Sequence, residues 1–238
     1  MTSASSIYRR PQWPLILLLP VTLLAFWPGY LTQLDDSPWQ VHFHGVTGFA
    51  WFLLLIGQSV LASRRQFVLH RKLGKATYVL APLVVLGGFL VLYTMGLRIN
   101  SETVSPFFET FGYRLAFIDL LGNLHFVAAV SLALVYKRDV ALHSRFMLSS
   151  VIPLLYAVFS RFYDFESFWT ISDASFITAE LIVLTLIVYD HRHGGIRFPW
   201  VLALGVLLVQ HALFRPIGDV AAWQTVFDSY WRLFAPAG

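Results

Sequence analysis

Residues 76–97, ATYVLAPLVVLGGFLVLYTMGL, decide the fold because they form a run without a charged side chain between Lys75 and Arg98. A helix that crosses a bilayer needs about 20 mostly apolar residues, and this run has that length. Pro82 lies inside it, where neighbouring membrane helices can compensate for the missing backbone hydrogen bond. The stretch therefore predicts a transmembrane helix, which we place over residues 74–96.

Other stretches of the 238-residue chain have a comparable length and hydropathy. Only 13% of the residues are charged, whereas soluble domains carry about 25%. We therefore predict an all-α integral membrane protein, with a single domain over residues 1–238 embedded in the lipid bilayer. The seven predicted transmembrane helices cover residues 13–32, 39–62, 74–96, 113–136, 146–163, 173–190 and 198–215.

Charge is distributed unevenly between the connecting loops. Most Lys and Arg residues lie in segments 1–12, 63–75, 137–145 and 191–197, which fall on one side if seven helices alternate. Because basic loops stay in the cytoplasm, we expect a cytoplasmic N-terminus, a periplasmic C-terminus and a location in the bacterial inner membrane. This asymmetry also explains the net charge of +4, so we expect no nucleic-acid partner.

Several classes of site are excluded by what the sequence lacks. It contains no cysteine, which excludes a disulfide, an iron–sulfur cluster, a thiolate zinc site and a cysteine nucleophile. Walker, G-x-G-x-x-G and G-x-S-x-G motifs are absent, and no residue stands out as catalytic. Lysines occur only at Lys72, Lys75 and Lys137, which excludes a retinal Schiff base in the seventh helix.

His70 and His143 form the first candidate site. Each lies in a basic loop just before a helix that starts on the cytoplasmic side, so both imidazoles should lie at similar depth. A haem iron with two axial ligands needs this arrangement, and Arg71 and Arg145 are cations that suit its propionates. Alternatively, both histidines are interfacial residues that hydrogen-bond loop carbonyls or lipid headgroups.

A stripe of small residues continues the helical face of His70. Such a stripe would admit a flat macrocycle, or it would let two helices pack closely. Its members are Gly74, Thr77, Ala81 and Gly88.

His44 and His125 form a second candidate pair. His44 lies near the outer start of its helix, with Trp51 and Gln58 on the same face, and His125 lies near the middle of another. At 1.5 Å per residue their depths differ by about 9 Å, which is a poor match for one iron. The alternative is a buried histidine satisfied by a neighbouring hydroxyl or carbonyl.

Ionisable residues in the outer halves of the helices form a third group. Charges inside a bilayer are expensive, so Asp119, Arg161 and Glu180 each need a partner or a role. Arg161 could pair with Asp119 or with Glu180 as a structural lock. The alternative is a polar cavity open to the periplasm, joined by His42, His44 and His211, that binds a metal or relays protons.

The C-terminal tail, residues 216–238, carries aromatic residues at three- to four-residue spacing. This pattern predicts a short interfacial helix on the outer face, which serves for anchoring or for contact with a partner. The aromatic residues are Trp223, Phe227, Tyr230, Trp231 and Phe234.

About half of the chain, from His44 to Arg161, resembles a family of uncharacterised bacterial membrane proteins built on four helices. The resemblance rests on His44 with Trp51 and Gln58 in one helix, on Arg161 one membrane-width after His143, and on the H-R-x-L-G and D-V-x-x-H-x-R-x-M elements. These two elements stand here as His70-Arg71-Lys72-Leu73-Gly74 and Asp139-Val140-Ala141-Leu142-His143-Ser144-Arg145-Phe146-Met147.

The same block is more distantly similar to the cytochrome b561-like group. That resemblance implies a four-helix core over residues 39–163 that holds haem b, with the first histidine paired to the third and the second to the fourth. Transferred here, His44 pairs with His125 and His70 pairs with His143, while the first, sixth and seventh helices are additions.

These observations support three hypotheses. The first is a membrane redox protein with haem b, which exchanges electrons with a quinone or a protein partner. The second is a non-enzymatic accessory or scaffold subunit of a membrane complex. The third is a metal-dependent membrane enzyme or proton-coupled transporter that uses the outer cluster of Asp119, Arg161, Glu180 and His211.

Overall fold

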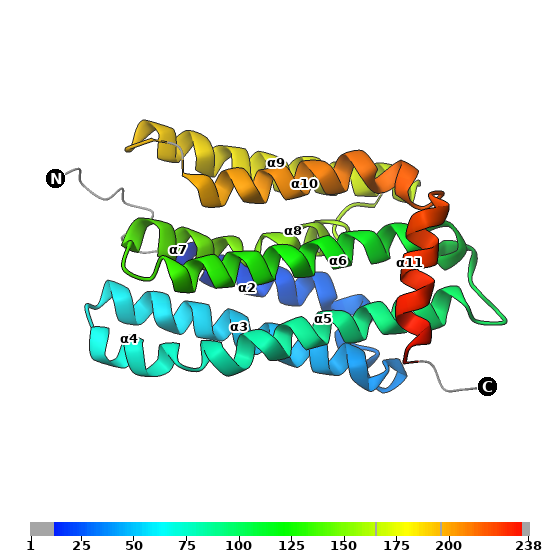
Figure 1. The fold of residues 1–238 in the computed structure, drawn as a ribbon, viewed down its shortest axis with the longest axis horizontal. Helices are drawn as coiled ribbons and strands as arrows, with labels where there is room; N and C mark the ends of the chain where they lie inside the picture. Colours follow the sequence, from blue (N-terminus) through cyan, green and yellow to red (C-terminus); the bar gives the residue numbers. More distant parts are fainter. Residues whose placement is uncertain (1–11, 165, 196, 235–238) are drawn as a thin grey trace.

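The computed structural model describes residues 12–234 except 165 and 196, and the described part of the chain is all-α (Figure 1). Seven helical segments in it are long and apolar enough to cross a membrane, which confirms the predicted architecture of a multi-pass membrane protein. These spans are Gln12–Leu31, Trp39–Ser63, Thr77–Ile99, Pro106–Val135, Val140–Phe159, Phe168–Arg192 and Phe198–Ile217.

Five spans are single helices, and two are composite. The single helices are α3 (Trp39–Ser63), α5 (Thr77–Ile99), α6 (Pro106–Val135), α9 (Phe168–Arg192) and α10 (Phe198–Ile217). The composite spans are α2 (Gln12–Phe26) continued by a π-helical turn (Trp27–Leu31), and α7 (Val140–Ser149) followed by α8 (Ile152–Phe159). Outside the spans lie a 3₁₀ turn (Leu34–Asp36), α4 (Phe67–Gly74) and α11 (Ala221–Arg232).

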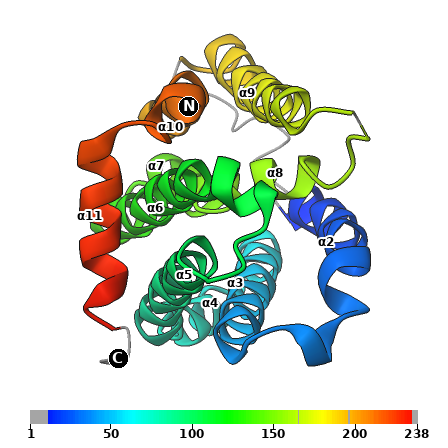
Figure 2. The same cartoon turned by 90° about the vertical axis from the view of Figure 1, so that its right-hand side faces the viewer.

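The spans run along the long axis of the molecule (Figure 1). We call the end with α4, the α6–α7 turn and the α9–α10 turn the basic end, because it holds the basic loops. The opposite end, with α11, is the acidic end. Seen from the acidic end in Figure 2, α3 and α5 lie on one side and α9 and α10 on the other, with α6, α7 and α8 between them.

The fifth span begins earlier than hydropathy predicts, at Val140 rather than at residue 146. The carboxylate of Asp139 caps it, since Oδ1 accepts hydrogen bonds from the backbone N–H groups of Ala141 (2.9 Å) and Leu142 (3.0 Å). The span breaks between α7 and α8 because Pro153 has no N–H to donate to the carbonyl of Ser149, four residues earlier.

The small-residue stripe does not lie on one continuous helix. His70 belongs to α4, which ends at Gly74, and α5 starts at Thr77. Further along the stripe, a Cβ on Gly88 would lie only 2.8 Å from Cγ of Asn123 in α6. Gly88 therefore serves close packing of α5 against α6.

The core consists of apolar layers between neighbouring spans. Between α3, α5 and α6, the ring of Trp51 packs edge-on against Phe126 with centroids 5.0 Å apart, and Trp51 Nε1 donates to Ser150 Oγ. Between α8, α9 and α10, Trp200 and Leu207 are almost fully buried. Many large apolar side chains on the perimeter remain exposed, as expected for a surface that faces lipid.

The predicted C-terminal helix exists as α11, and it packs against α5 and α6 across the acidic end (Figures 1 and 2). Trp223 Nε1 donates to the carbonyl of Tyr113 (2.8 Å), and Phe227 is buried. Tyr230 Oη donates to the carbonyl of Phe89 (2.6 Å), and burial raises the pKa of Tyr230 to about 12. These aromatic side chains thus join the helix to its own bundle.

Candidate functional site

His70 of α4 and His143 of α7 lie next to each other at the basic end. Their ring centroids are 6.5 Å apart, and the ring planes cross at 79°. Both side chains are half-buried. The structure thus brings together two imidazoles that are 73 positions apart in the sequence and belong to different helices.

The same nitrogen anchors both rings to the backbone. His70 Nδ1 lies 3.2 Å from the carbonyl oxygen of Gln58, and His143 Nδ1 lies 2.8 Å from that of Ala133. Because a carbonyl oxygen can only accept, each Nδ1 carries the proton and donates it. The lone pair of a neutral ring is then on Nε2, and neither Nε2 has a hydrogen-bond partner among the described residues.

This arrangement is the one found in metal-ligating histidines, where a carbonyl on one ring nitrogen fixes the tautomer and orients the other nitrogen. The spacing also suits one metal between the rings. Two imidazoles that both bind one metal ion, with metal–nitrogen distances of about 2.0 Å, have ring centroids no more than about 6.4 Å apart. The observed separation is 6.5 Å.

A buried amide without hydrogen-bond partners lies beside His70. Both Nε2 and Oε1 of Gln58 are buried and make no hydrogen bond to any described residue. A Cβ on Gly74 would lie 3.3 Å from this Nε2, so the amide lies against α4. Leaving buried polar atoms unpaired is costly. Nδ1 of His125 and Oε1 of Gln12 and Gln40 are buried without a partner in the same way.

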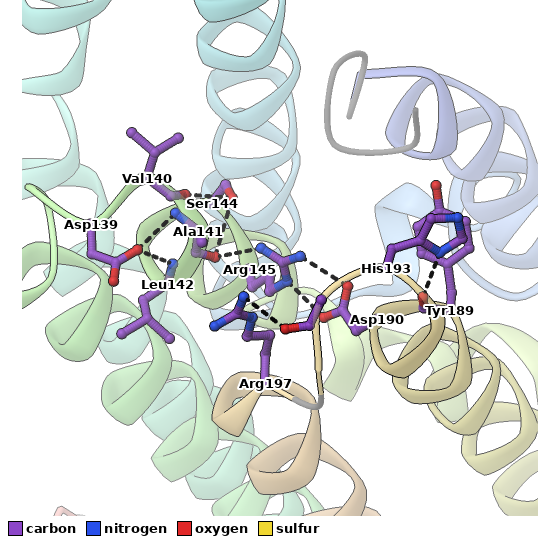
Figure 3. Close-up of polar contacts among 11 residues, drawn as sticks. Asp139, Val140, Ala141, Leu142, Ser144, Arg145, Tyr189, Asp190, His193 and Arg197 are labelled. Carbon is purple, nitrogen blue, oxygen red and sulfur yellow. Dashed lines mark hydrogen bonds and ion pairs between the residues drawn. The ribbon is translucent and has the colours of Figure 1, made fainter. Parts of the chain in front are cut away.

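The two arginines proposed for propionates differ in their surroundings. Arg71 is exposed, as is Lys72. Arg145 is buried and bound to Asp190 of α9, with Nε–Oδ2 at 2.7 Å and Nη2–Oδ1 at 2.9 Å (Figure 3). The guanidinium of Arg145 therefore joins α7 to α9, and Arg71 and Lys72 are the exposed cations next to His70.

His44 and His125 have separate neighbours. His44 of α3 lies against Gly87 of α5, where a Cβ would be 3.3 Å from the imidazole Nδ1. His125 of α6 is buried, and its Nε2 donates to the carbonyl of Ser149 at 2.9 Å. Pro153 leaves this carbonyl without a helical hydrogen-bond partner. His125 therefore supplies the hydrogen bond that is missing at the break between α7 and α8. Among the described residues, no ring contact joins His44 to His125.

The outer polar residues divide into two groups. Glu180 of α9 pairs with His211 of α10, with Oε1 2.9 Å from Nδ1, and Asp173 lies 3.7 Å from Nε2 of the same ring. Arg215 pairs with Asp173. His211, Asp173 and Arg215 line a shallow pocket of about 420 Å³ between α9 and α10.

Asp119 and Arg161 form the second group. They attract each other electrostatically, while the guanidinium of Arg161 lies 4.2 Å above the ring of Phe26 and donates to the carbonyl of Ala157. His42 instead contacts Tyr30, with Nδ1 2.8 Å from the phenolic oxygen.

No three His, Asp or Glu side chains in the described part of the chain are arranged to hold a metal ion. Sequence reasoning did not single out Asp190, Asp173 or the amide of Gln58 as partners. Asp190 had one usable signal, because an acid at the end of an apolar stretch requires a cation.

Comparison with known proteins leaves the chain without an assigned relative. No protein-family model, no curated protein and no solved structure matches it. The chain is a multi-pass helical membrane protein, and the resemblances drawn from its histidine motifs depend on those motifs alone.

Proposed function

We propose that this protein is a membrane redox protein that holds haem b between His70 and His143. The observation that carries the proposal is the pair of imidazoles 6.5 Å apart, each with Nδ1 donating to a backbone carbonyl and Nε2 unpartnered. The unsatisfied amide of Gln58 beside the pair supports it. We place the basic end in the cytoplasm of a bacterium and the protein in its inner membrane.

A haem bound here supplies one-electron transfer, with a quinone or a protein as electron partner. The residues of this chain have three roles in that proposal. His70 and His143 would hold the haem iron, and the carbonyls of Gln58 and Ala133 raise the basicity of their rings. The exposed cations Arg71 and Lys72 would attract propionates at the membrane boundary.

The test is the visible spectrum of the full-length protein, expressed with adequate haem supply and purified in mild detergent. We expect sharp α and β bands on reduction, as for iron with two imidazole ligands. His70→Ala and His143→Ala should each abolish the low-spin spectrum. His193→Ala is the matched control, because His193 is exposed at the same end and its Nδ1 binds the carbonyl of Tyr189.

Two outcomes would contradict the proposal in different ways. A low-spin spectrum that survives His143→Ala would remove that ligand assignment. A colourless wild-type protein, in cells where a control b-type cytochrome acquires its haem, would remove the haem itself. Stoichiometric copurification of a second membrane protein with the colourless chain would then favour the accessory-subunit hypothesis.

A further inference from the structure

Asp119 has an unusual environment for a carboxylate inside a membrane helix. It lies near the middle of α6, about 20 Å along the helix from Pro106 at 1.5 Å per residue. Its neighbours on the same helical face are buried, with Ala116 0%, Asn123 9% and Phe126 6% exposed, yet Asp119 itself is exposed. An accessible side chain on a buried face indicates a hollow in the bundle.

The position of Asp119 defines where this hollow lies. On α6, Asn123 lies against Gly88 of α5, and Gly122 packs against Pro153 of α8. Asp119 lies between these two directions on the helix and therefore faces the centre of the bundle. Figure 2 shows that α3 lies across the centre from α6, flanked by α5 and α8.

The contact between Trp51 of α3 and Phe126 of α6 shows which faces of the two helices are turned towards each other. Both helices run from the acidic end towards the basic end, and these two rings touch with centroids 5.0 Å apart. His44 precedes Trp51 by seven residues on α3, and Asp119 precedes Phe126 by seven residues on α6. Both therefore lie about 10 Å closer to the acidic end than the ring contact, on the same faces of their helices. His44 is also exposed, whereas Trp51 is only 2% exposed.

Charge at the mouth of the hollow is suited to this carboxylate. Arg161, at the acidic end of α8, is exposed and interacts electrostatically with Asp119 and Tyr156. The ionisable groups that interact with Asp119 are thus Tyr156 and Arg161 from the α8 region, while His44 of α3 lies against Gly87 of α5. Among the described residues, Asp119 forms no direct ion pair or hydrogen bond. Since an isolated carboxylate is expensive in lipid, Asp119 requires either contact with water or a bound proton.

We propose that a water-filled crevice opens from the acidic end between α3, α6 and α8, and that Asp119 is a proton-binding site within it. Trp51 and Phe126 close the crevice towards the basic end. The proposal does not depend on haem at His70 and His143, and it concerns the opposite half of the membrane.

The chain has no cysteine, so single cysteines can report water access without background. In oriented membrane vesicles, Asp119→Cys and His44→Cys should react with a charged, membrane-impermeant thiosulfonate added at the acidic end. Matched controls are Leu124→Cys, 50% exposed on another face of α6, and Ala129→Cys, fully buried. We expect at least about tenfold faster reaction at residue 119, because only a thiolate in water reacts.

Equal rates at positions 119 and 124, or reaction of Asp119→Cys only from the basic end, would overturn the crevice. If Asp119→Cys does not fold, the wild-type protein supplies the test through a water-soluble carbodiimide. Asp119 should then be modified while Asp190, 2% exposed, is not, and protection of both would contradict the proposal.

Proton binding has its own readout. Infrared difference spectra of wild-type protein should contain a protonated-carboxyl band that titrates with pH and is missing in Asp119→Asn. A wild-type protein without such a band, but with a reactive cysteine at position 119, would retain the crevice and overturn the proton site. The haem spectrum should be the same in Asp119→Asn and wild type, so failure here is distinguishable from failure of the redox proposal.

Discussion

Two polar pairs at the basic end differ in how completely their hydrogen bonds are satisfied. Arg145 and Asp190 are both buried, and each carboxylate oxygen of Asp190 accepts from one guanidinium nitrogen (Figure 3). His70 and His143 are half-buried, each with one ring nitrogen bound to a carbonyl and the other unpartnered within the described chain. The difference separates a pair that stabilises the fold from a pair that still has capacity to bind.

His125 shows that a histidine can belong to either class. It uses Nε2 to satisfy the carbonyl that Pro153 leaves unpaired, whereas His70 and His143 use Nδ1. A histidine in a membrane helix is therefore not by itself a ligand. Nδ1 of His125 is itself buried without a hydrogen-bond partner among the described residues, and His193 also binds a carbonyl through Nδ1, so what sets His70 and His143 apart is that their two rings lie next to each other.

The largest loss of stability should come from Asp190→Ala, which breaks the buried ion pair between Arg145 and Asp190. A buried guanidinium without its partner costs about 3–5 kcal/mol of unfolding free energy. Thermal unfolding in mild detergent measures the loss, and Asp190→Asn, which keeps an acceptor oxygen, should lose less. The visible spectrum of the folded fraction should match that of the wild-type protein. An unfolding temperature equal to that of wild type would contradict the structural role of this pair.

His125→Ala should cost about 1–3 kcal/mol, because it leaves the carbonyl of Ser149 buried and unpaired. The matched control is His193→Ala, since His193 is exposed and its substitution should change the free energy of unfolding very little. Unfolding temperature is again the measurement, together with the haem content per folded protein. Loss of haem from a stably folded His125→Ala protein would transfer the ligand role to this residue.

Gln58→Leu should stabilise the haem-free protein by about 1 kcal/mol, because it removes buried polar atoms that have no partner among the described residues. Gln224→Leu is a control of the same chemistry, since Gln224 Nε2 donates to the carbonyl of Gly218 at 2.7 Å. That variant should lose stability. If Gln58→Leu destabilises haem-free protein as much as the control does, the amide has a partner in the fold and does not mark a site.

The smallest stability effect is expected for His143→Ala in haem-free protein, about 0.5 kcal/mol for one half-buried hydrogen bond. Its effect on the spectrum of haem-loaded protein should be complete. Thermal unfolding of both forms separates the two contributions. A loss in haem-free protein as large as that of His125→Ala would place His143 with the structural histidines.

Hydropathy predicted all seven spans, but it placed the starts of the fourth, fifth and sixth five to seven residues too late. Side-chain caps account for the first two of these differences. The fifth span starts at Val140 because Asp139 caps it, and α6 starts at Pro106 because the hydroxyl of Ser105 accepts from the N–H of Phe108. A hydropathy average contains no hydrogen bonds, so it places both starts too late.

Pairing of side chains was harder to predict than their depth. The sequence places His70 and His143 at one end, and the structure brings their rings together. The same reasoning left Arg161 with two potential acids, whereas Glu180 pairs with His211. Depth depends on position along a helix, but a pair also requires the rotation of each helix and the choice of its neighbour.

The sequence by itself determined that this chain is a multi-pass helical membrane protein with its basic loops at one end. Those properties are sums over single residues, because each side chain contributes its own free energy of transfer from water into lipid. Only the tertiary structure decided that Arg145 binds Asp190, that His125 repairs the break at Pro153, and that Asp119 is accessible among buried neighbours. Each of these depends on which helix faces which, and packing between segments far apart in the sequence sets that.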